Sequence, residues 1–181
     1  FRFIEICLNF DNVHSTGIIN NNFILPLNRS YKDIIAGFKN DLKYSLSRAQ
    51  RKNLNYGTLP DYSRIIELYK TIYGKRFPHV TKGDYSRFQS LCSYLHKRRN
   101  LIIRATGLGN NLMAVSLLLD MDGRLYLIMS ATLPEGRRLR ANHFHINGII
   151  KEFSNRALIL DFEGSDIPGI AHFYKSFGCI N

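Results

Sequence analysis

Cysteines and long apolar runs are scarce in this chain, and each shortage excludes a class of protein. The three cysteines, Cys7, Cys92 and Cys179, lie far apart and form no Cys-x-x-Cys pair, so they predict neither a disulfide framework nor a zinc site. A reducing, cytoplasmic location fits them best. The longest apolar stretch, Leu112 to Leu119, is interrupted by Ser116 and is far shorter than the ~20 residues that span a bilayer. We therefore expect no membrane span and no metal cofactor.

Acidic residues are also few relative to basic ones. The sequence has 14 aspartates and glutamates against 25 lysines and arginines, which gives a formal net charge of +11. This excess favours anionic partners, among them nucleic acid, nucleotide cofactors and phosphate-bearing substrates, without choosing between them. The basic residues form three clusters: Lys39, Lys43, Arg48, Arg51 and Lys52; Lys97, Arg98, Arg99 and Arg104; and Arg137, Arg138 and Arg140.

The first part of the chain predicts two strands followed by helices. Alternating apolar residues predict strands over residues 1–8 and 22–27. Ser30 is a candidate cap for a helix that starts at Tyr31, and further helices are expected where apolar residues recur at helical spacing. These helices would carry Leu42 to Ala49, Ile65 to Tyr73 and Tyr85 to Leu95.

The second part predicts a sheet. The runs Leu101 to Thr106, Leu112 to Leu119 and Arg124 to Ala131 are separated by turn-forming residues, which indicates an antiparallel meander. A loop over residues 132–136 then leads to a helix that ends near Phe153.

The apolar run Ala157 to Leu160 follows this helix, and we expect a right-handed crossover that makes it parallel to the preceding strand. Ser165 or Asp166 is predicted to cap a final helix, with Pro168 in its first turn and Gly178 at its end.

The closing segment, Leu160 to Gly178, resembles that of Fem-type transferases, in which an Asp-Phe-Gly-Gly-like turn precedes a helix ending Phe-Lys-x-x-Phe-Gly. It is also similar to the ending Tyr-x-x-x-Gly-Phe of GNAT acyltransferases, through Tyr174 and Gly178. Residues 22–53 resemble the passage that joins the two GNAT-like halves of a Fem-like protein. Because the chain begins without a methionine and stops just after the final helix, we expect it to be the C-terminal half of a longer protein.

This resemblance implies an α/β (α+β) GNAT fold: a mixed central sheet with an antiparallel meander, a crossover helix and a splayed parallel strand pair. Residues 1–30 would end a preceding GNAT-like half or form linking strands, and residues 31–181 would form the acyltransferase domain. The backbone of the splayed strands would bind the acyl donor, and the helix start after Gly136 would bind its phosphates. The donor-binding residues expected on this basis are Ser130, Ala131, Gly136, Arg137, Arg138, Arg140 and Ala141.

Acyl transfer to an amine needs an acid for the leaving group and a base for the amine. Tyr174 is the candidate acid, and a tyrosine that only packs its ring is the alternative. Glu163 is the candidate base, although Asp161 competes and a carboxylate in such a turn often caps backbone amides. Asp161, Ser165 and Lys175 are further candidates for substrate binding, Lys175 being expected on the exposed side of its helix.

Two departures from the family patterns affect the donor. Tyr174 stands where the Fem pattern tends to have lysine, which favours an acyl-CoA thioester such as acetyl-CoA. Against this, residues 136–141 do not reproduce the GNAT pyrophosphate loop, Arg/Gln-x-x-Gly-x-Gly/Ala. The alternative to a phosphate-binding role is that these arginines form the solvated start of a helix.

Three hypotheses follow. The first is an N-acyltransferase that uses acyl-CoA and a small-molecule or peptide amine. The second is a Fem-like transferase that takes its donor from tRNA for cell-wall peptide synthesis, which the basic helices would serve. The third is a non-catalytic GNAT-like binding module. His143 and His145 are two apart on a helix, which makes them a poor metal pair.

Overall fold

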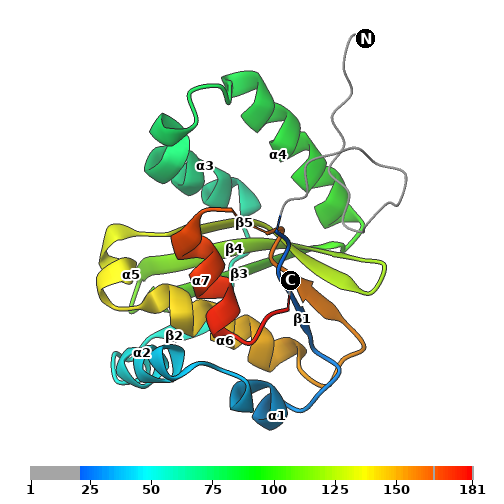
Figure 1. Ribbon diagram of the computed structural model, residues 1–181. Coiled ribbons are helices and arrows are strands. Elements are labelled where there is room, and N and C mark those ends of the chain that lie inside the picture. Colours follow the sequence, from blue (N-terminus) through cyan, green and yellow to red (C-terminus); the bar gives the residue numbers. More distant parts are fainter. Residues whose placement is uncertain (1–20, 165, 181) are drawn as a thin grey trace.

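The computed structural model describes residues 21–164 and 166–180, which fold around one six-stranded sheet (Figure 1). The strand order is β1-β6-β5-β4-β3-β2. The strands are β1 Ile24–Pro26, β2 Asn55–Thr58, β3 Leu101–Leu108, β4 Asn111–Met121, β5 Arg124–Thr132 and β6 Ile159–Asp161. The helices are α1 Tyr31–Ala36, α2 Asn40–Gln50, α3 Tyr62–Tyr73, η1 Gly74–Arg76, α4 Lys82–Lys97, α5 Pro134–Arg138, α6 Ala141–Phe153 and α7 Pro168–Ser176. The strand expected over residues 1–8 lies outside the described residues.

Strands β3, β4 and β5 form the predicted antiparallel meander. Asp122 and Gly123 both have positive φ, at 51° and 76°, which is the backbone of a tight hairpin turn. The first turn is shorter than expected, because β3 continues to Leu108 and β4 begins at Asn111.

Strands β5 and β6 form the predicted parallel pair, and they separate early. Their register joins Arg124 to Ile159, Leu125 to Leu160 and Tyr126 to Asp161. Strand β5 then runs on to Thr132, whereas β6 ends at Asp161. The fold is thus the expected mixed sheet with a parallel pair that opens at its carboxyl end.

Helices cover both faces of the sheet (Figure 1). Helices α3 and α4 cover one face, and α6 covers the other with α1 and α2 outside it. Strand β4 is apolar at almost every position from Leu112 to Leu119 and is buried on both faces, which explains the two layers, because successive side chains point to opposite faces. The core on the α6 side includes Phe23, Leu25, Phe38, Leu118, Leu125, Ile149, Leu160, Phe162 and Phe177. The core under α3 and α4 includes Ile65, Ile66, Cys92, Leu101, Ile103, Val115, Leu117 and Ala131.

Residues 55–58, for which the sequence predicted no element, form β2, which pairs with β3 although its side chains are mostly exposed. Two local expectations were wrong. Residues 134–138 form helix α5 instead of a loop. The cap of α7 is Ile167, which makes no side-chain cap bond, while Asp166 accepts hydrogen bonds from Asn21. Ser165, the other candidate cap and a candidate substrate contact, lies outside the described residues.

Candidate active site

Tyr174 lies on α7 with its ring among phenylalanines. Its ring centroid is 4.5 Å from that of Phe162, just beyond β6, and 6.0 Å from that of Phe23. The hydroxyl forms no hydrogen bond within the described residues, yet it is not among the polar atoms there that are sealed from solvent without a partner. Burial, with a smaller effect from Cys179, raises the pKa of Tyr174 to about 12. The phenol therefore stays protonated at neutral pH.

Glu163 and Asp161 differ in availability. The Asp161 side chain is buried, and its Oδ2 lies 2.7 Å from Arg124 Nη1. Its Oδ1 accepts the backbone N–H of Glu163 at 2.9 Å. The ion pair between Asp161 on β6 and Arg124 on β5 thus joins the two parallel strands. Glu163 is exposed, with a positive φ of 61°. Partial loss of hydration, and then the Asp161 carboxylate, raise the pKa of Glu163.

Gly136 is a packing glycine within α5. A β-carbon at this position would lie 2.1 Å from the carbonyl oxygen of Met113 on β4, so only glycine lets the helix approach the strand this closely. Ala141, the first residue of α6, is buried as well. Neither residue presents a side chain to a ligand, which leaves backbone amides as their contribution to any donor site.

The three adjacent arginines point in different directions. Arg137 lies towards α3, where its Nη2 is 3.3 Å from the Tyr73 hydroxyl. Arg140 has a positive φ of 58° between α5 and α6 and turns towards α2, where its Nη1 donates to Ser45 Oγ at 2.6 Å. Arg138 is exposed. The cluster predicted from the sequence is therefore divided between opposite sides of the sheet.

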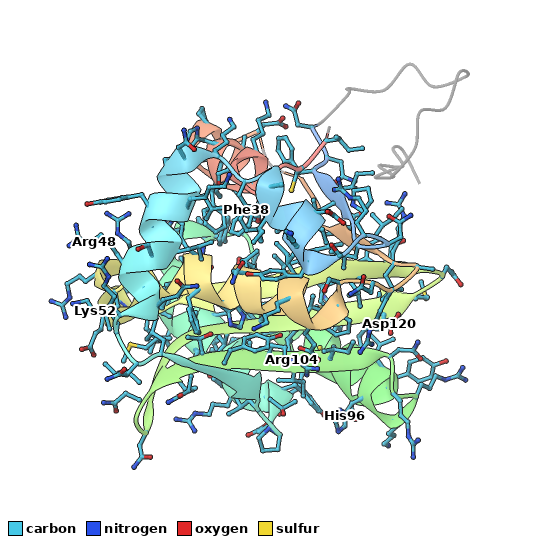
Figure 2. The ribbon with its side chains drawn as sticks, turned by 90° about the horizontal axis from the view of Figure 1, so that it is seen from below. Phe38, Arg48, Lys52, His96, Arg104 and Asp120 are labelled. Carbon is cyan, nitrogen blue, oxygen red and sulfur yellow. The ribbon has the colours of Figure 1, made fainter. Side chains whose placement is uncertain are left out.

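A basic, aromatic surface lies on α2. The Tyr44 ring is 58% exposed, with the guanidinium of Arg48 5.8 Å and that of Arg140 5.6 Å from its centroid. A hydrogen bond and the charge from Arg48 lower the pKa of the phenol. We call this the Tyr44 surface; its pocket, of about 400 Å³, is lined by Tyr44, Ser47, Arg48, Arg51 and Lys52. Figure 2 shows Arg48 and Lys52 on the outer side of α2.

The first turn of α6 holds two buried polar atoms without hydrogen-bond partners among the described residues. Asn142 Oδ1 and His143 Nδ1 are sealed from solvent and have no hydrogen-bond partner within the described residues. The His143 ring lies edge-on to Phe173, with centroids 5.1 Å apart. Burial, and then Arg140, lower the pKa of His143, against an opposing effect of Asp41. The imidazole is therefore neutral near pH 7.

A buried polar row crosses the sheet below α6. His145 Nδ1 is 2.9 Å from Thr106 Oγ1 on β3, and its Nε2 is 2.8 Å from Ser116 Oγ on β4. Ser116 Oγ in turn lies 3.3 Å from Ser130 Oγ on β5. The Ser130 hydroxyl thus faces α6, and Ala131 faces the opposite core. Strand β6 does not pair with β5 at Ser130 and Ala131. These two residues can therefore offer only their backbone groups to a ligand that lies along β5.

A second polar group lies on the same face. Glu152 on α6 forms a bidentate ion pair with Arg104 on β3, in which Nε donates to Oε2 at 2.7 Å. The Tyr56 hydroxyl on β2 donates to Glu152 at 2.6 Å. Figure 2 shows Arg104 in the part of the sheet that lies next to α6. The ring of Tyr56 occupies the space that a side chain at Gly148 would need.

The sequence analysis did not identify the tyrosines whose rings contact these arginines. Tyr44 precedes Arg48 by four residues, which places them on one helix face, so that pair was available from spacing. The contact of Tyr73 with Arg137 joins residues far apart in the chain, and no local signal predicts it. Lys175 is exposed as expected, with its Nζ 5.4 Å from the centroid of the Phe23 ring.

The described residues contain neither a membrane-spanning helix nor a cluster of metal ligands. None of their helices is long and apolar enough to cross a membrane. Within residues 21–164 and 166–180, no three His, Cys, Asp or Glu side chains come together in a way that could hold a metal ion.

Comparison with solved structures shows that the chain shares its fold with FemX and with other proteins. FemX matches with a TM-score of 0.74 over 95% of this chain, at 14% identity. A conserved protein of unknown function from Bacteroides thetaiotaomicron matches at 0.63 over 88% of this chain, with 10% identity and 56% of its own length covered. The C-terminal domain of a protein described as a lysylphosphatidylglycerol synthetase from Agrobacterium fabrum matches at 0.50 over 87%, with 12% identity and 56% covered.

The chain spans 62% of the length of FemX. Its sequence matches no protein-family model and no curated protein. At these identities the structural matches establish the fold, which is one that FemX and the synthetase domain share.

Proposed function

We propose that this chain is the acyl-transfer domain of a transferase that moves an aminoacyl group from the 3′ end of an RNA to an amine. The observation that carries the proposal is the opening between β5 and β6 beyond Tyr126, with Tyr174 packed at the end of β6. Unpaired backbone groups along β5 suit an extended acyl group, because they offer strand-like hydrogen bonds.

The chemistry needs one base and one acid. The amine nitrogen attacks the acyl carbon, the bond from that carbon to the ester oxygen breaks, and the amine loses a proton. Glu163, whose pKa is raised, accepts the amine proton. Tyr174 donates a proton to the departing oxygen.

The acidity of Tyr174 favours an ester over a thioester. A phenol with a pKa of about 12 transfers its proton readily only to a leaving group that is at least as basic. A thiol such as that of cysteine has a pKa near 8.5, so a departing thiolate is weakly basic and needs no such acid. A departing sugar alkoxide is far more basic. An RNA 3′ ester therefore matches Tyr174 better than the acyl-CoA donor suggested by the sequence.

The Tyr44 surface supplies a place for the RNA. Single-stranded nucleic acid binds through arginine and lysine contacts to phosphates and through stacking on aromatic rings. Arg48, Arg51, Lys52 and Arg140 surround the exposed Tyr44 ring in this arrangement. FemX and the synthetase domain, which share the fold, are consistent with transfer of an aminoacyl group.

A direct test compares donors. Filter binding and single-turnover transfer to a panel of amines would use aminoacylated tRNA, uncharged tRNA, acetyl-CoA and a longer acyl-CoA. We expect both tRNAs to bind with affinity that falls steeply with salt, and only the aminoacylated one to lose its acyl group in an amine-dependent reaction. The Arg48→Gln and Arg140→Gln variants should weaken RNA binding. Arg98→Gln serves as a control, because Arg98 is an exposed arginine that caps the C-terminal end of α4.

A thioester donor is the second candidate, and the α6 start favours it. Arg140 provides no side-chain cap for α6, and although the His143 N–H already donates to the Arg140 carbonyl, the N–H groups of Ala141 and Asn142 suit a pyrophosphate. Transfer from acetyl-CoA but not from aminoacyl-tRNA would select this donor and reject the RNA. Binding of tRNA without transfer to any amine would instead indicate a non-catalytic binding module.

A further inference from the structure

A pocket of about 420 Å³ opens between α3 and α5, on the side of the sheet opposite the Tyr44 surface. It lies at the end of β5, where the backbone N–H of Thr132 approaches the Tyr73 hydroxyl at 3.5 Å. We call it the Tyr73 pocket. Its walls combine apolar and basic side chains: Leu68, Thr71, Ile72, Arg76, Leu133, Pro134 and Arg137.

Both basic residues of the pocket are held on one tyrosine ring. The guanidinium of Arg76 lies 5.5 Å and that of Arg137 5.6 Å from the centroid of Tyr73. Arg137 also donates to the Tyr73 hydroxyl. Stacking of this kind orders a guanidinium and leaves its edge free to bind an anion.

Within residues 21–164 and 166–180, no carboxylate forms an ion pair with these two arginines. None of the residues that line the pocket is acidic. The nearby Glu67 is paired with Lys70 at 3.7 Å. Two ordered, uncompensated guanidiniums above the apolar wall of Leu68, Ile72 and Leu133 match a ligand with both an anionic and an apolar part.

We propose that the Tyr73 pocket binds the anionic group of the amine substrate, a carboxylate or a phosphate attached to an apolar group. The assignment to the amine substrate rests on the proposed function, because Arg140 and the Tyr44 surface place the donor on the other side of the sheet. The pocket is at the far end of β5 from Tyr126, so binding there is remote from the reacting bond. Such remote contacts hold the amine in position for attack.

The test is isothermal titration of the full chain with small anions, in the absence of any donor. N-benzoylglycine tests a carboxylate, phenyl phosphate tests a phosphate ester, and N-benzoylglycinamide is the matched neutral compound. We expect saturable one-to-one binding of at least one anion and at least tenfold weaker binding of the amide; the tighter anion identifies the group.

Variants locate the site. Arg76→Gln and Arg137→Gln should each weaken anion binding by about tenfold, and Tyr73→Phe, which keeps the ring, should weaken it less. Arg98→Gln is the matched control, because Arg98 also lies over a tyrosine, Tyr94, at 4.6 Å but lines neither of these pockets. Absence of saturable binding, equal binding of the amide, or an equal loss in Arg98→Gln would contradict anion binding by the Tyr73 pocket.

The two proposals fail in different ways. Anion binding that depends on Arg76 and Arg137 without any acyl transfer would retain the pocket and reject its assignment to an amine substrate. Acyl transfer from RNA without anion binding by any probe would retain the proposed function and reject the pocket.

Discussion

His145 on α6 is hydrogen-bonded through Nε2 to the Ser116 hydroxyl on β4, 2.8 Å away, inside the core. This contact and the one to Thr106 tie the crossover helix to two strands of the meander. Burial, and then the charge of Arg104, lower the pKa of His145 to about 3. The ring is therefore neutral in the folded protein throughout the range in which a free histidine titrates.

The first prediction concerns pH. An unfolded histidine binds a proton below about pH 6.5, whereas folded His145 does not until about pH 3. The stability from this residue is therefore present above pH 6.5 and is lost as the pH falls. Between pH 6.5 and 5 the loss should be about 1.5 to 2 kcal/mol. Urea unfolding at several pH values measures it; His145→Gln should flatten the dependence and His79→Gln, an exposed substitution, should not. Equal slopes for all three proteins would contradict this account.

The second prediction concerns Gly136. Gly136→Ala places a β-carbon against the backbone of Met113, at 2.1 Å in the present geometry, so α5 must move away from β4. We expect a loss of about 1 to 3 kcal/mol in the free energy of unfolding. Gly169→Ala on α7 is the control, because its β-carbon would meet nothing within 4 Å. Chemical denaturation compares the two variants, and equal stability would show that α5 is loosely packed.

The third prediction concerns Glu152. Glu152→Ala leaves the Arg104 guanidinium, whose side chain is 15% exposed, without its carboxylate and also removes the partner of Tyr56. We expect a destabilisation of about 3 kcal/mol, as for the loss of one member of a largely buried pair. Glu67→Ala removes an exposed pair with Lys70 and should cost no more than about 0.5 kcal/mol. Similar losses in the two variants would indicate that Arg104 can reach solvent.

The sequence pattern predicted most of the sheet. It did not predict the elements β2 and α5, whose formation depends on contacts with distant residues. The three strand-like runs in residues 101–131 with the turn-forming residues between them, and the apolar run at 157–160, predicted the meander and the parallel strand. Strand β2 has no such pattern, and it is a strand only through its pairing with β3. Helix α5 contains Pro134 and Gly136, which indicate a loop until the close contact with Met113 is known.

The candidate site shows the same limit. Arg137, Arg138 and Arg140 are neighbours in sequence, but the left-handed backbone at Arg140 separates α5 from α6. Arg137 and Arg140 consequently contact tyrosines on different helices, Tyr73 and Tyr44. Gly178, in contrast, follows the end of α7 at a positive φ of 76° as expected, whereas the catalytic role assigned to Tyr174 from its spacing to Gly178 stays a prediction.

The last prediction concerns Tyr174. Tyr174→Phe keeps the ring and its contacts with Phe162 and Phe23 and removes a hydroxyl that has no hydrogen-bond partner within the described residues. The free energy of unfolding should therefore change by less than about 0.5 kcal/mol, and RNA binding should be unaffected. If the phenol protonates the leaving oxygen, single-turnover transfer from aminoacyl-tRNA should fall by about 100-fold or more.

The pH profile and a matched variant separate this role from packing. Glu163 must be deprotonated to accept a proton, so transfer to an amine that is already neutral over this range should rise with pH through the raised pKa of Glu163 and then stay level, because Tyr174 remains protonated well above neutral pH. Glu163→Gln should remove that rise, and Tyr94→Phe, an exposed tyrosine on α4, should leave the rate unchanged. Equal transfer by the parent and Tyr174→Phe would make Tyr174 a packing residue, and the leaving group would then depart without an acid from this chain.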